Sequence, residues 1–68
     1  MKTYKEQVVS AAAGLGCRSK DLDNVWNVVK TYSVPLTAKS LVYQVANAMD
    51  DLGMSPDTSM ISAVASRL

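Results

Sequence analysis

Signals that start and stop helices recur along this chain, and they constrain its fold more than any other feature of the sequence. Thr3 and Glu6 have the spacing of a capping box, in which each side chain accepts from the other residue's backbone amide. Further hydroxyl residues stand where a helix could begin, at Ser19, Thr37 and Ser55. Residues that end helices separate these starts, at Gly16, Pro35 and Gly53.

Apolar residues between these signals recur every three or four positions, which places them on one face of a helix. Leu41, Val45 and Met49 show this pattern in the third segment. Pro56 follows the Ser55 cap candidate, and proline suits the first position of a helix. The sequence therefore predicts a single all-α domain over residues 1–68, a compact bundle of about four short helices over residues 4–14, 20–32, 38–52 and 56–67.

The size of the chain limits its stability. A domain of 68 residues buries only about 60% of the surface that its unfolded chain exposes, so small domains gain stability from disulfides, metals or self-association. Cys17 is the only cysteine and the sequence has no histidine, so an internal disulfide is impossible and a transition-metal site is not expected. We therefore expect no cofactor and no metal, and we expect a homodimer.

Charge and hydropathy give no direct indication of a partner. Seven basic and six acidic residues leave a net charge of +1, which is too balanced to indicate nucleic acid or membrane binding by itself. No stretch approaches the roughly 20 apolar residues that cross a bilayer, and the first residues do not follow the pattern of an export signal. We expect no membrane association, and the single cysteine favours a cytoplasmic location.

Catalysis is not expected from these residues. The absence of histidine excludes the Ser-His and Cys-His nucleophile pairs. Cys17 adjoins Arg18, which could lower the pKa of the thiol, or the thiol could simply pack between helices. Asp50, Asp51 and Asp57 could surround a divalent cation or form ordinary solvated surface, and their spacing matches no calcium loop. The sequence is interpreted as that of a protein that is not an enzyme.

The segment from Thr37 to Leu68 reads as a helix, a short turn containing Gly53 and a second helix. With its Leu52-Gly53-Met54-Ser55 turn, it resembles the helix-turn-helix families of small DNA-binding regulators, and a longer turn like this one occurs in some winged-helix regulators. The resemblance implies that residues 56–67 enter the major groove of double-stranded DNA. The residues that would contact DNA are Lys39, Ser55, Thr58, Ser59, Ser62 and Arg67.

Phosphate contact needs cations, and the fourth segment holds only Arg67. Other cations that could take part in such a contact are Lys2, Lys5, Arg18 and Lys20 near the amino-terminal end, and Lys39 at the start of the third helix. They would form a basic patch if the first and third helices share a face.

Three methionines bracket the turn before the fourth segment, at Met49, Met54 and Met60. Methionine suits adaptable interfaces as well as cores, so these residues could form a dimer or partner interface, or pack inside. Tyr43 and Val28 lie off the main apolar stripes and add to the predicted exposed apolar surface. Two hypotheses follow: a dimeric helix-turn-helix-like transcription or replication regulator, or a non-enzymatic helical module that binds and modulates a partner protein.

Overall fold

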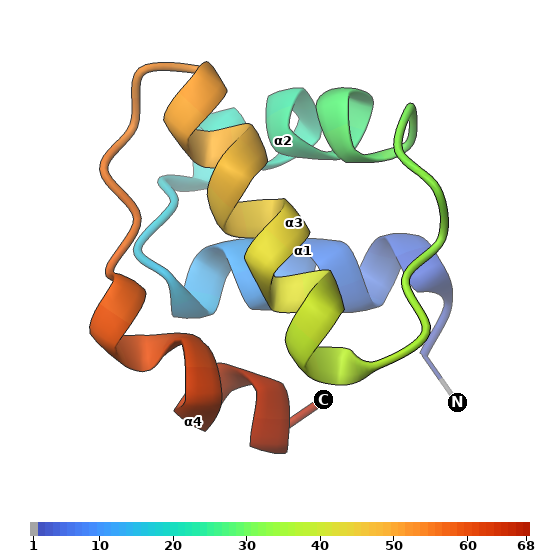
Figure 1. Ribbon diagram of the computed structural model, residues 1–68. Helices are drawn as coiled ribbons and strands as arrows, with labels where there is room; N and C mark the ends of the chain where they lie inside the picture. Colours follow the sequence, from blue (N-terminus) through green and yellow to red (C-terminus); the bar gives the residue numbers. More distant parts are fainter. Residues whose placement is uncertain (1) are drawn as a thin grey trace.

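The computed structural model describes residues 2–68 as a bundle of four α-helices without strands, which confirms the predicted fold class (Figure 1). The helices are α1 (Tyr4–Gly14), α2 (Leu22–Val29), α3 (Ala38–Asp51) and α4 (Ile61–Ser66). Single 3₁₀ turns over Ser19–Asp21 and Thr58–Met60 lead into α2 and α4. α1 and α3 form the centre of the bundle, because each packs against the other three helices.

The predicted starts of α1 and α3 are confirmed. Thr3 Oγ1 accepts from the Glu6 amide at 3.1 Å, and Glu6 Oε1 accepts from the Thr3 amide at 3.0 Å. These hydrogen bonds also lower the pKa of the Glu6 carboxyl. Thr37 Oγ1 accepts from the Ser40 amide at 3.1 Å. Each hydroxyl thus satisfies an amide that the helix leaves without a partner.

The predicted stops at Gly16 and Gly53 are also confirmed, and they share one geometry. Both glycines have positive φ, 95° and 80°, a conformation that costs other residues energy. After Gly16, the Cys17 amide donates to Ala12 O at 2.9 Å. After Gly53, the Met54 amide donates to Met49 O at 2.9 Å. Both are Schellman motifs, which place a residue just beyond the helix against its last turn.

The predicted start of the fourth helix at Ser55 and Pro56 is wrong. Asp57 caps this segment instead, because its Oδ1 accepts from the Ser59 amide at 3.2 Å. The Asp57 amide is occupied elsewhere, since it donates to Leu15 O at 3.0 Å. The backbone of Asp57 is extended, with ψ of 91°, so residue 57 lies outside the helix and α4 is shorter than the sequence indicated.

The second helix also differs at both ends from the predicted range 20–32. It enters through the 3₁₀ turn at Ser19–Asp21, with no side-chain cap from Ser19. It ends at Val29 because the following residues tighten to three-residue hydrogen bonds. The Thr31 amide donates to Val28 O at 3.1 Å, and the Thr31 hydroxyl donates to the same oxygen at 2.7 Å.

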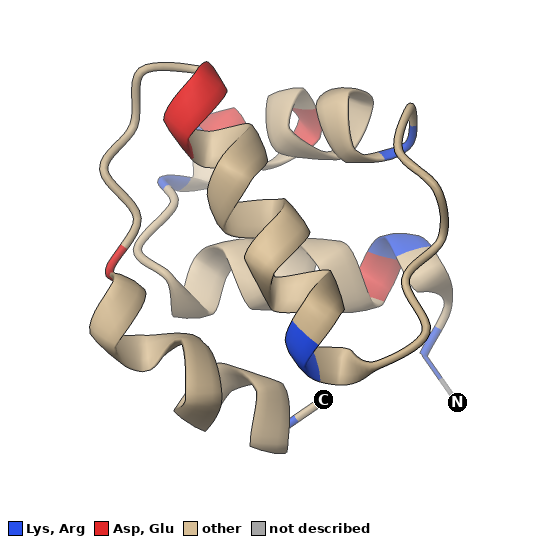
Figure 2. Cartoon of the chain, in the orientation of Figure 1, with Lys and Arg blue, Asp and Glu red and all other residues tan. Residues whose placement is uncertain are grey.

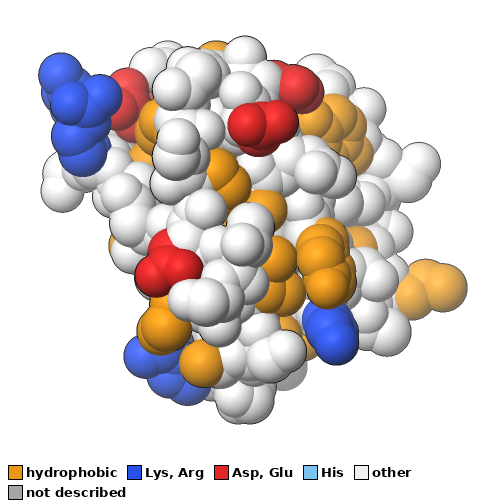
Figure 3. All heavy atoms as spheres, turned by 60° about the vertical axis from the view of Figure 1, so that its left-hand side comes forward, with side chains coloured by type: hydrophobic (Ala, Val, Ile, Leu, Met, Phe, Trp, Pro, Cys, Tyr) orange, Lys and Arg blue, Asp and Glu red, His pale blue; other side chains and the backbone are white. Residues whose placement is uncertain are grey.

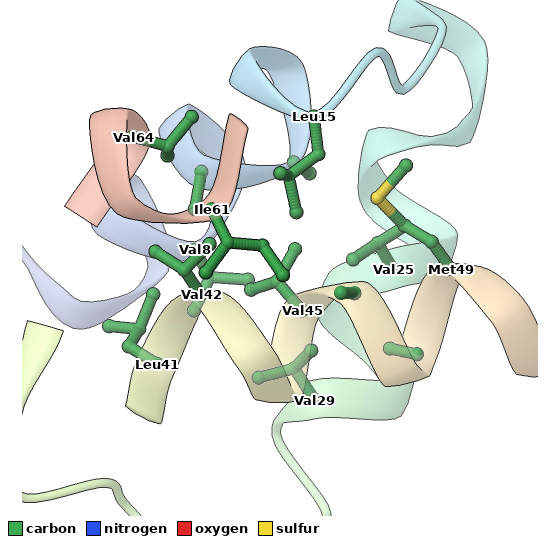
Figure 4. Close-up of a cluster of buried hydrophobic side chains, with 14 residues drawn as sticks. Val8, Leu15, Val25, Val29, Leu41, Val42, Val45, Met49, Ile61 and Val64 are labelled. Carbon is green, nitrogen blue, oxygen red and sulfur yellow. The ribbon is translucent and has the colours of Figure 1, made fainter. Parts of the chain in front are cut away.

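All four helices contribute to one core of small and medium side chains (Figure 4). Valine dominates it, and its largest fully buried side chains are Leu15, Met49, Val8, Val25, Val29, Val42 and Val45. Trp26 is half-buried and packs at the edge of this core, with its ring 5.6 Å from that of Tyr4 in an edge-on arrangement. The small side chains allow close helix contact: a Cβ on Gly14 would lie 2.8 Å from a methyl of Val64.

Candidate interaction surfaces

The connection between α3 and α4, residues 52–57, is tied to the rest of the molecule. Its Asp57 amide bonds to Leu15 O, as described above, and Met54 Sδ lies 3.8 Å from Cys17 Sγ. Both sulfur-bearing residues follow the glycine of a Schellman motif, so two helix ends meet at this contact. The connection is therefore a structural joint. It holds the end of α1 against the end of α3 and the start of the segment that leads into α4.

The three methionines predicted as an interface lie inward. Met49 is 1% exposed and belongs to the core, so core packing holds for this residue and it offers no surface to a partner. Met54 and Met60 are half-buried and pack against the core. The reason is the Schellman geometry at Gly53, which turns the chain back over the last turn of α3.

Cys17 is half-buried, and its surroundings do not activate it. Burial raises the pKa of the thiol, the nearby Asp21 carboxylate raises it further, and Arg18 only partly opposes them. Sγ also lies 3.4 Å from Arg18 O, to which it can donate. A raised pKa keeps the thiol protonated, which is the opposite of what a nucleophile needs.

The six residues implied to contact DNA are all exposed, and they do not line one common hollow. Ser55 and Thr58 line a groove of about 560 Å³ beside α3, together with Tyr43 and Asp50. Ser59 Oγ is engaged by the Asp57 carboxylate. The other three of the six residues, Lys39, Ser62 and Arg67, do not line this groove. The charged residue that lines the groove is thus the acidic Asp50, which does not favour contact with phosphate.

The basic residues are dispersed (Figure 2). Arg67 lines a separate hollow with Lys2, near Gly14. Lys2 and Lys5 lie at the start of α1, whereas Arg18 and Lys20 follow its opposite end. Arg18 is further engaged by Asp21, with Nε 3.4 Å from Oδ2. The basic patch expected from the amino-terminal cations is therefore divided.

An exposed apolar segment that sequence reasoning did not single out lies between α2 and α3. It consists of Val34, Pro35 and Leu36, here called the Val34–Leu36 segment. Val34 is 70% and Leu36 is 99% exposed. Both ends are fixed, because Gln44 Nε2 donates to Ser33 O at 3.1 Å and Thr37 caps α3. The segment borders a hollow of about 240 Å³ whose other lining residues include Tyr4, Leu41 and Leu68.

A signal for this segment was present in the sequence. Val34 and Leu36 flank a proline and belong to none of the helical stripes, so no helix could bury them by its periodicity.

Neither a family model, nor a curated protein, nor a solved structure matches this chain. None of the helices in the described part of the chain combines the length and the apolar character required to cross a bilayer.

Proposed function

We propose that this chain is a non-enzymatic helical module that binds a partner protein through the Val34–Leu36 segment. The observation that carries the proposal is the 99% exposure of Leu36. A leucine held this far into solvent gains free energy when a partner covers it, about 1.5–3 kcal/mol for full burial. The partner that fits is a protein with an apolar pocket that takes the leucine side chain.

The fixed ends of the segment support this role. Hydrogen bonds at Ser33 and Thr37 hold the backbone on either side of it, and Pro35 restricts φ between its two apolar neighbours. A held loop loses less conformational entropy on binding than a free one, which leaves more of the burial energy for affinity. The adjoining hollow adds further apolar contact at its rim.

Three features support a binding role without catalysis. The sequence has no histidine, and the one cysteine has a raised pKa. Within residues 2–68, His, Cys, Asp and Glu side chains do not gather in groups of three that could hold a metal ion. We place the module in the cytoplasm, where a single unpaired thiol stays reduced.

Site-specific photo-crosslinking tests the proposal. A photo-reactive amino acid replaces Leu36 in one variant and Ser59, an exposed residue of the side that the resemblance assigns to DNA, in the matched control. We expect one dominant protein adduct, identified by mass spectrometry, from position 36 and not from position 59. Equal adducts from both positions, or adducts from position 59 alone, would contradict the proposal.

DNA binding is a second proposal, supported by the arrangement around Gly53. α3, the 52–57 connection and α4 follow one another as in a helix-turn-helix unit, and Thr58, Ser59, Ser62 and Arg67 are exposed. Its weakness is electrostatic, because Arg67 is the single cation at this end of the chain and Asp50 lies in the adjacent groove.

Fluorescence anisotropy with a random duplex at two salt concentrations tests the second proposal. A DNA-binding protein shows binding that weakens steeply with salt, because phosphate contacts release counterions. Arg67→Ala reduces that salt dependence if Arg67 contacts phosphate. Absence of salt-sensitive binding below about 10⁻⁴ M would remove the DNA proposal.

A further inference from the structure

The outward face of α3 is a second surface, lined by different residues from the Val34–Leu36 segment. Lys39, Tyr43, Asn47 and Asp50 are exposed along it, and Tyr43 retains 50% of its accessible surface. Their spacing of three and four residues places them in one stripe along the helix. The last three line the groove described above, together with the apolar side chains of Ala46, Pro56 and Ile61.

Charge is separated along this stripe. Figure 3 shows a face of the molecule with acidic side chains near the top and at the middle left, basic side chains at the upper left, lower left and lower right, and hydrophobic side chains between them. Along α3 itself, Lys39 lies in the first turn, and Asp50 and Asp51 lie in the last.

Both ends of α3 carry charge of the sign that the helix dipole disfavours. A helix is stabilised by anions near its first turn and by cations near its last, whereas α3 has the reverse. Nothing in the described part of the chain offsets this, because neither Lys39 nor Asp50 has an ion-pair partner there. Asp51 only accepts from the Tyr32 hydroxyl, at 3.3 Å. The charges of α3 therefore do not serve the stability of the helix itself.

A second α3 running antiparallel complements this face. The midpoint between Lys39 and Asp50 along the helix coincides with the midpoint between Tyr43 and Ala46. A two-fold axis through that point brings Lys39 of each chain opposite Asp50 of the other. The same axis brings the large Tyr43 ring opposite the small Ala46, beside the groove. Unlike charges thus meet at the two ends of the stripe, and unlike side-chain sizes meet near its middle.

We propose that α3 pairs antiparallel with α3 of a second copy of this chain, with each Tyr43 entering the groove of the other copy. The contact uses the same patch on both chains, so it closes as a two-fold dimer. The antiparallel arrangement also sets each helix end beside the opposite dipole of its neighbour.

The area of the face limits the strength of the dimer. α3 has 14 residues, which corresponds to a length of about 21 Å, and the face is one helix wide. Such a contact is smaller than the roughly 800 Å² per partner of a stable interface. We therefore expect a dissociation constant on the order of 10⁻⁴ M. The charged ends fix the direction of pairing, and Tyr43 supplies most of the buried apolar surface.

Sedimentation velocity over about 0.01–1 mM protein at low salt tests the proposal, since this range brackets the expected constant. We expect Lys39→Glu and Asp50→Lys each to weaken association by at least about fivefold, because each creates two like-charge contacts across the axis. The double variant Lys39→Glu/Asp50→Lys restores unlike pairs and is expected to return association to within about twofold of the wild type. Tyr43→Ala removes association.

The charge reversals cannot act by weakening the helix. Each one gives α3 a charge that its dipole favours, so both variants keep the helix content and melting temperature of the wild type in dilute solution. Lys20→Glu is the matched control, because Lys20 is an exposed cation remote from α3 in the chain. It leaves association unchanged.

Three results would overturn the proposal. The first is a monomer across the whole concentration range. The second is association that either single reversal leaves intact, or that the double variant does not restore. The third is association lost in Leu36→Ser, which would assign the contact to the Val34–Leu36 segment. Under the proposal Leu36→Ser still dimerises while it loses the partner protein, so failure of one idea is distinguishable from failure of the other.

Discussion

The two proline-containing connections of this molecule have opposite roles. The 52–57 connection bonds to α1 and turns Met54 onto Cys17. The 30–37 connection is held at Ser33 and Thr37, yet Leu36 between them is 99% exposed. An apolar side chain within two residues of a proline thus forms part of a structural joint in one place and an open apolar surface in the other.

The difference arises at the end of the preceding helix. α3 ends in a glycine with positive φ, which directs the next residues back over the helix. α2 ends without a glycine and unwinds through three-residue hydrogen bonds into the segment before Pro35. The connection that resembles a DNA-binding turn is therefore the one in which Met54 packs against the core, although Leu52 at its start remains 41% exposed.

Met49→Ala gives the largest contrast between the two connections. Met49 is fully buried at the base of the 52–57 connection, so its truncation is expected to cost about 2–5 kcal/mol. Leu36→Ala, in the open connection, is expected to change stability by less than about 0.5 kcal/mol. Urea unfolding of both variants measures the contrast. Equal losses would mean that Leu36 is buried in solution.

Gly53→Ala tests whether the glycine conformation makes the joint. No atom lies within 4 Å of a Cβ built at this position, so the expected loss of about 1–2 kcal/mol comes from the backbone alone. Gly53→Asn is expected to lose less, because asparagine tolerates this conformation better. Thermal unfolding of the pair decides the matter, and an alanine variant as stable as the wild type would refute it.

The helix starts that follow the two connections differ in their caps. Thr37→Ala and Asp57→Ala are each expected to cost about 1 kcal/mol, because each removes a side-chain cap. Ser55→Ala is expected to be near neutral, since Asp57 and not Ser55 caps the 3₁₀ turn before α4. Chemical denaturation of the three variants measures this, and a costly Ser55→Ala would reinstate the start expected from the sequence.

The smallest expected effect within the joint is the pH dependence that the Cys17 thiol gives to stability. Its folded pKa is raised by burial and by Asp21, so this contribution to stability is complete below the unfolded value of about 8.5 and is lost as pH rises through the folded pKa. Alkylation by iodoacetamide at pH 8 is expected to be slower in the folded protein than in urea. Equally fast alkylation in both states would show that the thiol is not sheltered.

Local signals in the sequence predicted most of the fold. The capping box at Thr3, the cap at Thr37 and the stops at Gly16 and Gly53 each act through neighbouring residues, so they can be identified without a structure. The start of α4 could not be predicted in this way. It depends on the cap and the extended backbone at Asp57, in a connection that the bond from the Asp57 amide to Leu15 O ties to a residue far away in the sequence.

The candidate surfaces were less predictable for the same reason. Whether Met54 or Leu36 faces solvent depends on how two helix ends meet, and periodicity within a helix does not contain that information. Tyr43 was different, because its position off the apolar stripe of the third segment already predicted an exposed ring.

The affinity of the crosslinked partner for wild type and for Leu36→Ser tests the central claim most directly. Isothermal titration with both forms is compared with Ser59→Ala as the control. The loss of one buried leucine is expected to weaken binding by roughly ten- to a hundredfold, with unchanged thermal stability. Equal affinity of wild type and Leu36→Ser would contradict the assignment of the Val34–Leu36 segment as the binding surface.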